Sequence, residues 1–210
     1  LSAWAADEVV AVNSQVTVTG GSKVGGIVGI NAGSIRSVSP DGKNSGYLVC
    51  EAGRVYALNG YAGGIAGEAQ GDIRRARNRS TEVTAGRGPA GGIVAVNQAG
   101  VRLEECENQG SVKSDQGYAG GIAAENYGTI TGCFVGYSGV NQKTAALTSR
   151  GTKEIGAVCA INHENAEIQN STLYDNVILE GEAQTAGGIA GVNRGTIGHL
   201  PTGNEVEEIT

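Results

Sequence analysis

The stretch Ala119–Ile130 (AGGIAAENYGTI) decides how this chain folds, because copies of it recur along almost the whole sequence. Close copies are Val24–Ile35 (VGGIVGINAGSI) and Ala186–Ile197 (AGGIAGVNRGTI). Looser copies begin at Ala62, Ala90 and Ile155. Successive copies place their second glycine position at 26, 64, 92, 121, 157 and 188, so the steps are 28 to 38 residues long. Units this short must bury their apolar faces against the copies before and after them. The sequence therefore predicts a single stack of coils.

The composition favours strands over helices. The chain has 36 glycines, no methionine, one phenylalanine and one tryptophan among 210 residues, and its apolar residues are mostly Ala, Val and Ile. Small and β-branched side chains suit the narrow interior of a flattened coil of strands, whereas each glycine of a pair would cost a helix up to ~1 kcal/mol. We therefore expect an all-β, parallel β-solenoid of about six to seven coils, with three short strands per coil.

The unit around residue 121 shows where these three strands are expected. They are residues 121–125, residues 129–133 and a third segment near Leu147–Thr148, which corresponds to Ser111–Ser114 one unit earlier. A corner between the first two strands carries glycine in four units, at positions 33, 71, 128 and 195. We expect a positive φ at this corner, because glycine adopts it at little cost.

The repeats place the whole chain in one domain. Residues 1–23 would form a partial first coil or a cap, residues 24–198 the repeats, and residues 199–210 a C-terminal tail. Trp4 is expected to cover the open end of the stack. Neither end resembles the capping unit that a repeat array needs, so we expect further domains of a longer chain to flank this one.

Two insertions account for the longest steps between repeats. In residues 39–59, the apolar patches 47–49 and 55–58 are expected to pair as a protruding hairpin. Residues 135–152 are expected to form a longer loop. Inserted loops usually gather on one face of a repeat protein and carry its binding sites when it has any.

The charge balance disfavours two classes of partner. The net charge is -6 and the isoelectric point is about 5.0, which suits neither nucleic acid nor an anionic membrane surface. No apolar run approaches the ~18 residues of a membrane span, and residues 1–8 lack the basic and apolar regions of a secretory signal. We therefore expect no nucleic-acid binding and no membrane insertion.

Asparagine recurs at the fifth position after the second glycine of the units. The members of this series are Asn31, Asn97, Asn126, Asn162 and Asn193, and only Ala69 interrupts it. Side-chain amides that stack in register hydrogen-bond along the column. The series is therefore predicted to form a structural ladder along the stack.

Three arginines of the second unit align with three glutamates of the third. With Ile73 placed over Leu103, the pairs are Arg74–Glu104, Arg75–Glu105 and Arg77–Glu107. A basic patch for an acidic glycan or nucleic acid is one interpretation. Because every arginine already has a carboxylate, we favour the other, in which the pairs fix which coil stacks on which. Exposed pairs of this kind contribute only some tenths of a kcal/mol each.

The four cysteines, Cys50, Cys106, Cys133 and Cys159, are too few to staple a chain of this size. Cys159 falls at a core position of its unit. Cys106 and Cys133 end matching apolar-x-x-Cys patterns, so they should be neighbours on adjacent coils. Strands ~4.8 Å apart would allow a disulfide there only with strain, and we expect free thiols.

The phrase Gly-Gly-Ile-Val-Gly-Ile-Asn-x-Gly-x-Ile, followed in two units by apolar-x-x-Cys, resembles the GLUG repeat of surface proteins from Gram-positive and gut bacteria. That repeat also occurs in a region of IgA1-specific metallopeptidases. The resemblance covers roughly residues 24–198 and departs from the motif at Ala69, at Ala157 and at both insertions. It implies a right-handed parallel β-helix in a secreted or wall-attached protein, often an adhesin, and it implies no single function.

The sequence offers little for metal binding or nucleophilic catalysis. The segment His163–Glu167 (HENAE) lacks the second histidine of a zinc-peptidase motif. The only other histidine, His199, is far away in the repeat. We therefore interpret both histidines as surface turn residues and expect neither a metal nor a cofactor.

A carbohydrate-active β-helix is the rival hypothesis. Glycoside chemistry needs two carboxylates ~5 to 10 Å apart, and Glu68 and Glu125 occupy equivalent positions two coils apart, where they should point outward. Aromatic side chains that could contact a sugar are sparse. The candidate contacts are Tyr47, Tyr56, Tyr61, Tyr118 and Tyr137.

The function expected from the sequence is a non-catalytic structural or adhesion repeat module of a bacterial cell-surface or secreted protein. Its location would be extracellular, and its partner would be a host or environmental glycan or a protein. The alternative is a carbohydrate-active β-helix, either a polysaccharide lyase or a glycan-binding module.

Overall fold

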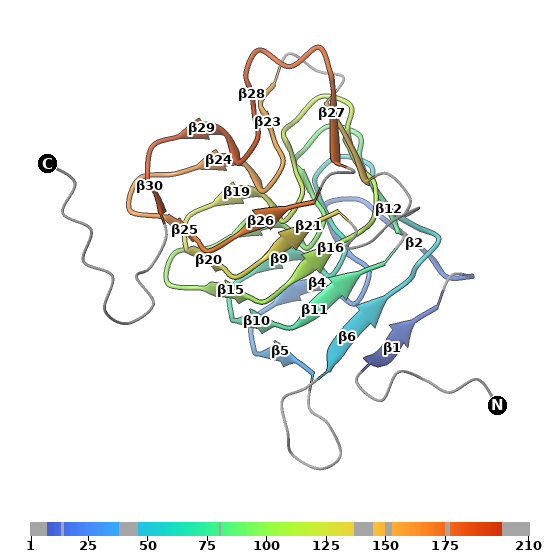
Figure 1. Ribbon diagram of the computed structural model, residues 1–210. Coiled ribbons are helices and arrows are strands. Elements are labelled where there is room, and N and C mark those ends of the chain that lie inside the picture. Colours follow the sequence, from blue (N-terminus) through green and yellow to red (C-terminus); the bar gives the residue numbers. More distant parts are fainter. Residues whose placement is uncertain are drawn as a thin grey trace, which may run out of the picture.

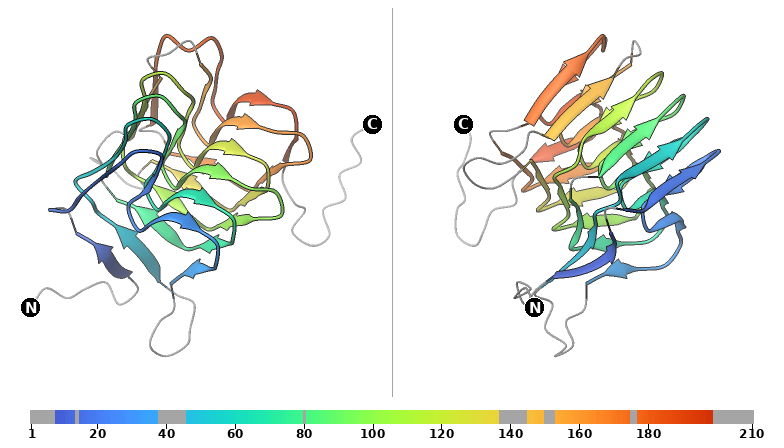
Figure 2. Two further views of the ribbon diagram at one scale, coloured as in Figure 1. Left: turned by 180° about the vertical axis from the view of Figure 1, so that it is seen from behind. Right: turned by 90° about the vertical axis from the view of Figure 1, so that its right-hand side faces the viewer.

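The computed structural model describes residues 8–13, 15–37, 46–79, 81–136, 145–149, 153–174 and 177–198. Within these residues the chain has no helix. It winds through six coils, and each coil contributes one strand to each of five parallel sheets, named A to E in chain order. Equivalent strands of successive coils lie side by side, as Figures 1 and 2 show. The fold is a parallel β-solenoid, so the predicted fold class is confirmed.

The strand bounds follow the repeat. Sheet A contains β1 (Glu8–Val12), β6 (Tyr47–Cys50), β11 (Ala76–Asn78), β16 (Glu107–Asn108), β21 (Phe134–Val135) and β26 (Thr172–Leu173). Sheet B contains β2 (Thr17–Gly20), β7 (Arg54–Ala57), β12 (Glu82–Ala85), β17 (Val112–Ser114), β22 (Ala145–Ser149) and β27 (Val177–Gly181). Sheet C contains β3 (Lys23–Gly25), β8 (Tyr61–Gly63), β13 (Ala90–Gly91), β18 (Ala119–Gly120), β23 (Ile155–Gly156) and β28 (Ala186–Gly187).

The remaining two sheets complete each coil. Sheet D contains β4 (Val28–Asn31), β9 (Ala66–Ala69), β14 (Val94–Asn97), β19 (Ala123–Asn126), β24 (Cys159–Asn162) and β29 (Ala190–Asn193). Sheet E contains β5 (Ile35–Arg36), β10 (Ile73–Arg74), β15 (Arg102–Glu104), β20 (Thr129–Thr131), β25 (Glu167–Gln169) and β30 (Thr196–Gly198).

Each coil has five strands rather than the three predicted. The three expected segments of the unit around residue 121 correspond to β19, β20 and β22. The strands that sequence reasoning missed in this unit, β18 and β21, are only two residues long. Two residues are too few to show the alternation by which a strand is recognised in a sequence.

Large apolar side chains form columns in the interior. One column contains Ile65, Ile93 and Ile122, another contains Ile73 and Leu103, and all five are fully buried. The alanines of sheet C in the middle coils are also fully buried, so small side chains fill the narrow interior there. Burial decreases in the last coil, where β30 leaves Ile197 42% exposed.

The glycine pair that opens each copy of the repeat lies in the tight turn between sheets C and D. A Cβ on Gly91 would overlap the carbonyl oxygen of Val94 within the same turn. A Cβ on Gly92 would overlap the carbonyl oxygen of Gly121 in the next coil and the side chain of Asn108. Glycine is therefore favoured here because two stretches of backbone approach each other closely, although the fifth coil accommodates Ala157 at the second position.

The glycines of the corner between sheets D and E, among them Gly71 and Gly128, do not have the predicted positive φ, although Gly100 (77°) and Asn165 (63°) have it at this corner in two other coils. Glycine is needed there because a Cβ would overlap the backbone of the preceding coil, at Gly33 for the first and at Val101 for the second. Positive φ instead recurs at the corner between sheets E and A. The residues with positive φ at that corner are Arg75 (51°), Glu105 (52°), Gly132 (59°) and Asn170 (48°).

The predicted hairpin in residues 39–59 is wrong. Strand β6 pairs with β1 and β11, and β7 pairs with β2 and β12, all in parallel, so both segments belong to the second coil. The predicted loop of 135–152 is also interrupted by β22, which pairs with β17 and β27 in sheet B. Two apolar alternating segments are compatible with a local hairpin or with two sheets of a solenoid, and only their pairing partners distinguish these folds.

The N-terminal segment belongs to the stack. Strands β1 and β2 pair with the second coil along their full lengths, so residues 8–20 are part of a first coil that β3, β4 and β5 complete. The expectation that Trp4 covers the end of the stack falls outside the described residues, as does the predicted tail of 199–210.

We predict that Gly92→Ala destabilises the fold by more than ~1 kcal/mol, because its Cβ would meet backbone that cannot move without shifting the next coil. The matched control is Gly188→Ala in the last coil, where nothing lies within 4 Å of the added Cβ. The control should change the free energy of unfolding by no more than ~0.5 kcal/mol. Urea denaturation followed by circular dichroism measures both. Equal effects would show that close approach of the coils does not explain the glycine pair.

Candidate functional site

The asparagine column lies at the end of the sheet D strands, and its amides bond from coil to coil. Asn97 Nδ2 donates to Asn126 Oδ1, Asn126 Nδ2 to Asn162 Oδ1, and Asn162 Nδ2 to Asn193 Oδ1, each at 2.8 Å. Below the interruption at Ala69, Asn31 Nδ2 donates instead to the carbonyl oxygen of Gly71 at 2.7 Å. The series therefore contributes to stacking rather than to a surface site.

A second, shorter asparagine ladder lies in sheet A. Asn78 Nδ2 donates to Asn108 Oδ1 at 2.8 Å, and both residues are fully buried. Sequence reasoning missed this pair, although it stands one position after the predicted pair Arg77–Glu107. Both ladders begin with an orphaned acceptor, because Asn97 Oδ1 and Asn78 Oδ1 are buried without a hydrogen-bond partner among the described residues.

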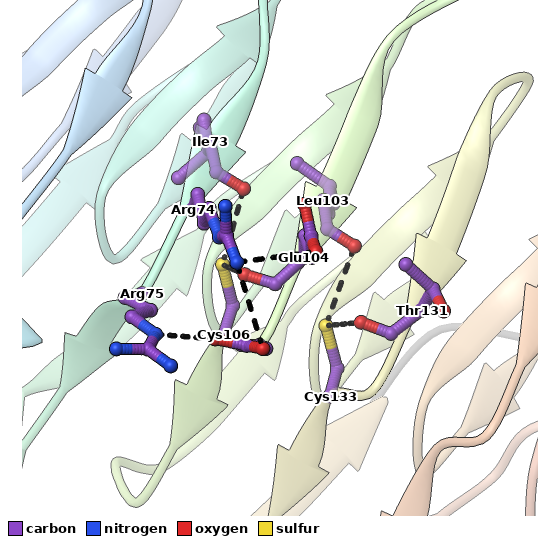
Figure 3. Close-up of polar contacts among 9 residues, drawn as sticks. Ile73, Arg74, Arg75, Leu103, Glu104, Cys106, Thr131 and Cys133 are labelled. Carbon is purple, nitrogen blue, oxygen red and sulfur yellow. Dashed lines mark hydrogen bonds and ion pairs between the residues drawn. The ribbon is translucent and has the colours of Figure 1, made fainter. Parts of the chain in front are cut away.

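The aligned arginines and glutamates lie at the corner between sheets E and A, and Figure 3 shows part of this cluster. Arg74 Nη2 lies 3.6 Å from Glu104 Oε1 and 3.8 Å from Glu105 Oε1. Arg75 Nε donates to Glu105 Oε2. The structure thus brings together the residues that the thirty-residue offset aligned.

The third pair, Arg77–Glu107, is the least exposed of the three. Arg77 Nη2 lies 2.6 Å from Glu107 Oε2, with side chains 16% and 6% exposed. The guanidinium also lies 4.0 Å from the ring centroid of Tyr47, a cation–π contact. Gln109 Nε2 donates to the other oxygen of Glu107. Glu107 is thus saturated by neighbours.

A cavity lies next to this cluster, on sheet E in the first three coils. It has a volume of about 210 Å³ and contains four arginines and two carboxylates in its wall. The charged lining residues are Arg36, Arg74, Arg75, Arg102, Asp72 and Glu104, and Ser34 and Ser37 add hydroxyl groups. We call this cavity the arginine pocket.

The cysteines are all free and all buried, as expected. Cys106 Sγ lies 3.5 Å from the carbonyl oxygen of Ile73, and Cys133 Sγ lies 3.6 Å from that of Leu103 (Figure 3). Each thiol therefore bonds to the backbone of the preceding coil. Burial raises the pKa of Cys133 well above its usual value, so this thiol stays protonated and unreactive.

Glu68 lies on sheet D and is only 5% exposed, although it was expected to point outward. Its carboxylate accepts hydrogen bonds from Gln70 Nε2 at 2.8 Å and Gln98 Nε2 at 3.2 Å, and it forms an ion pair with Lys23. Burial alone would raise the pKa of Glu68. The hydrogen bonds and the Lys23 ammonium outweigh burial and hold the pKa below its ordinary value.

Glu125 has the equivalent position two coils further on and a similar pair of donors. Its Oε2 lies 3.0 Å from the hydroxyl of Tyr127 and 3.1 Å from Nε2 of His163. The Tyr127 and His163 rings stack with centroids 3.9 Å apart. Burial and the Glu125 carboxylate raise the pKa of Tyr127 to about 12, so its hydroxyl donates at neutral pH. His163 is thus a half-buried member of a hydrogen-bonded cluster.

The candidate tyrosines do not form one platform. Tyr47 is in sheet A, Tyr56 in sheet B and Tyr61 in sheet C, while Tyr118 directly precedes β18 of sheet C. Tyr56 and Tyr118 each lie near a cation, Arg54 at 4.6 Å and Lys153 at 5.8 Å from the ring centroid. The predicted contact Tyr137 lies outside the described residues, as does His199.

The described residues contain neither a candidate metal site nor a candidate membrane-spanning helix. No group of three or more His, Cys, Asp or Glu side chains there is placed to hold a metal ion. The same part of the chain contains no helix that is long and apolar enough to cross a membrane.

The fold and its surface define a parallel β-solenoid with the arginine pocket and three glutamates, Glu68, Glu107 and Glu125, that are held by neighbouring side chains. Comparisons with known proteins add no family to this description: no protein-family model, no curated protein and no solved structure matches the chain.

We predict that Asn126→Ala lowers the free energy of unfolding by about 1–3 kcal/mol, because the buried amide of Asn97 loses one of its two acceptors and Asn162 loses its donor. Asn193→Ala is the matched control. That residue is exposed at the end of the ladder, so its loss should cost less than ~1 kcal/mol. Thermal and urea unfolding measure the loss in free energy of unfolding for each variant. Similar losses at both positions would show that the buried ladder does not stabilise the stack.

We predict that Glu68→Gln changes how stability depends on pH. A carboxyl whose pKa is lowered by folding stabilises the protein above its unfolded-state pKa of about 4.3. This contribution disappears as the pH falls through the folded-state pKa. The variant should therefore be less stable than the parent at pH 7, with the gap closing towards pH 3.

The measurement is urea denaturation at both pH values. Glu82→Gln is the control, because that exposed carboxylate should affect stability little at either pH. A stability gap for Glu68→Gln that is as large at pH 3 as at pH 7 would contradict the prediction.

Proposed function

We propose that this chain is a non-catalytic repeat module of a bacterial cell-surface or secreted protein, where it serves as a stiff spacer or an adhesion surface. The observation that carries the proposal is the parallel pairing of equivalent strands through the whole stack. All five sheets run through six coils, and coil-to-coil hydrogen bonds follow the stack axis. Such a structure holds exposed side chains at fixed spacings, which suits a scaffold that presents a surface.

The state of the carboxylates supports a non-catalytic role. A general acid in glycoside hydrolysis needs a raised pKa, so that it holds a proton at the working pH. The pKa of Glu68 is shifted in the opposite direction. Glu107 accepts hydrogen bonds from Arg77 and Gln109 on its two oxygens, and Oε2 of Glu125 contacts both Tyr127 and His163.

The bacterial origin and the extracellular location rest on the sequence resemblance to the GLUG repeat. The resemblance implies a parallel β-helix, and the parallel β-solenoid architecture is compatible with it. On this proposal the partner is a host or environmental glycan, or a protein, that contacts the outer face of the sheets.

A carbohydrate-active β-helix is the alternative, and one observation favours it. Glu125, Tyr127 and His163 form a compact cluster that joins a carboxylate, a phenol and an imidazole on neighbouring coils. Such a set contains acid and base groups within hydrogen-bond reach of each other, which catalysis requires.

An activity screen separates the two proposals. The whole chain is incubated with a panel of neutral and acidic polysaccharides, and reducing ends and unsaturated uronates are measured. We expect no turnover above that of a heat-denatured sample. Turnover that disappears in Glu125→Gln or Glu68→Gln, but persists in Glu82→Gln, would overturn the non-catalytic proposal in favour of the enzyme.

A further inference from the structure

The arginine pocket carries more positive charge than its own side chains neutralise. Four arginines stand in its wall against two carboxylates, and Glu105 beside the wall pairs with Arg75, which leaves an excess of one positive charge. This local excess contrasts with the net charge of -6 for the whole chain. We propose that the pocket binds an anionic oxygen group, the carboxylate or sulfate of an acidic glycan. The glycan identity rests on the adhesion role proposed above, whereas the anion site rests on the pocket itself.

The register of sheet E places two arginines opposite each other. Arg36 in β5 pairs directly with Arg74 in β10, and Arg74 pairs in turn with Glu104 in β15. Like charges directly opposite on neighbouring strands are destabilising. The pair that joins the second and third coils, Arg74 and Glu104, has opposite charges. Arg36 of the first coil is therefore an additional cation at the end of this column. A bound anion would relieve the repulsion.

Donors in the pocket are left without acceptors. Arg74 Nε is buried and has no hydrogen-bond partner among the described residues. Within the same part of the chain, no ion pair joins the exposed side chains of Arg36 or Arg102 to a carboxylate. Buried donors in folded proteins are nearly always satisfied. The N–H of Arg74 Nε is therefore an unsatisfied donor in the wall of the pocket, where the contacts within the chain are incomplete.

The two carboxylates in the wall are already engaged. Glu104 lies 3.6 Å from Arg74 Nη2, and Asp72 Oδ1 accepts the backbone N–H of Arg102 at 2.9 Å. These two carboxylates hold Arg74 and the backbone of Arg102 in place. The guanidinium groups of Arg36 and Arg102 are therefore available to a ligand. Guanidinium forks match the planar geometry of carboxylate oxygens and also bind sulfate and phosphate oxygens.

The extent of the pocket favours an acidic glycan over a nucleic acid. Along the column of Arg102, the next two coils place Thr129 and Glu167, so the basic surface ends there. A nucleic acid needs a basic groove that follows several phosphates, and single strands also need aromatic rings for their bases. The pocket lining contains no aromatic residue. One or two anionic groups at a time fit this surface.

Nuclear magnetic resonance of the arginine Nε–H groups tests the proposal on the full chain. The probes are a galacturonate tetrasaccharide, a sulfated chondroitin tetrasaccharide, neutral cellotetraose and inorganic sulfate. We expect both acidic saccharides to shift the Arg74 Nε–H resonance, with binding that weakens as sodium chloride is added. Cellotetraose should leave it unchanged. The relative affinities of the acidic saccharides and inorganic sulfate separate a glycan site from a site for a free anion.

Arg36→Gln should weaken binding of the acidic saccharides about tenfold, the loss expected for one charge-assisted contact. It should not lower the melting temperature in low salt, because it also removes the repulsion with Arg74. Arg54→Gln, an exposed arginine on sheet B, is the control and should leave binding unchanged.

Three results would overturn the proposal. They are no shift with any acidic probe, equal weakening in Arg54→Gln, and tighter binding of a DNA oligonucleotide than of either acidic saccharide. Tighter binding of inorganic sulfate than of both saccharides would retain the anion site but overturn its assignment to a glycan. Polysaccharide turnover in the activity screen would refute the non-catalytic proposal while leaving this binding result intact, so the two failures are distinguishable.

Discussion

Parallel pairing of the coils in register is the constraint on which the rest of the structure depends. Neighbouring strands lie ~4.8 Å apart, so each side chain has the equivalent residue of the next coil as its axial neighbour. Isoleucine therefore stacks on isoleucine, the amide of Asn97 reaches that of Asn126, and Gly92 allows the backbone of the next coil to approach. A shift of one residue would turn the buried columns outward and break all of these contacts together.

Many of these contacts between coils could be predicted from the repeat period of the sequence. An offset of about thirty residues was enough to place Asn97 beside Asn126 and Arg77 beside Glu107, because in-register stacking turns sequence alignment into proximity. Alignment was less informative within a coil. It could not reveal the two-residue strands β18 and β21, and it could not distinguish the solenoid strands β6 and β7 from a hairpin.

The arginine pocket was missed for a different reason. The sequence alignment pairs Arg74 with Glu104 of the next unit. The neighbour of Arg74 in the preceding coil, Arg36, becomes evident only in the register of sheet E. Aligned residues of complementary charge or hydrogen-bonding type indicate contacts that hold neighbouring coils together. Aligned residues that are not complementary indicate a possible binding surface. The column of Arg36 shows such a failure, and so does the buried, unpaired nitrogen of Arg74. Glu68 and Glu125, by contrast, accept hydrogen bonds from neighbouring side chains.

The four free cysteines leave the coils without any covalent link to one another. Under tension, such a chain can unspool from one end, releasing one turn at a time. The shortest step between repeats is 28 residues, and at ~3.4 Å per extended residue each released turn would add roughly 100 Å of length in place of ~4.8 Å of height. Stacking without covalent links would therefore let the chain lengthen by one turn at a time when pulled.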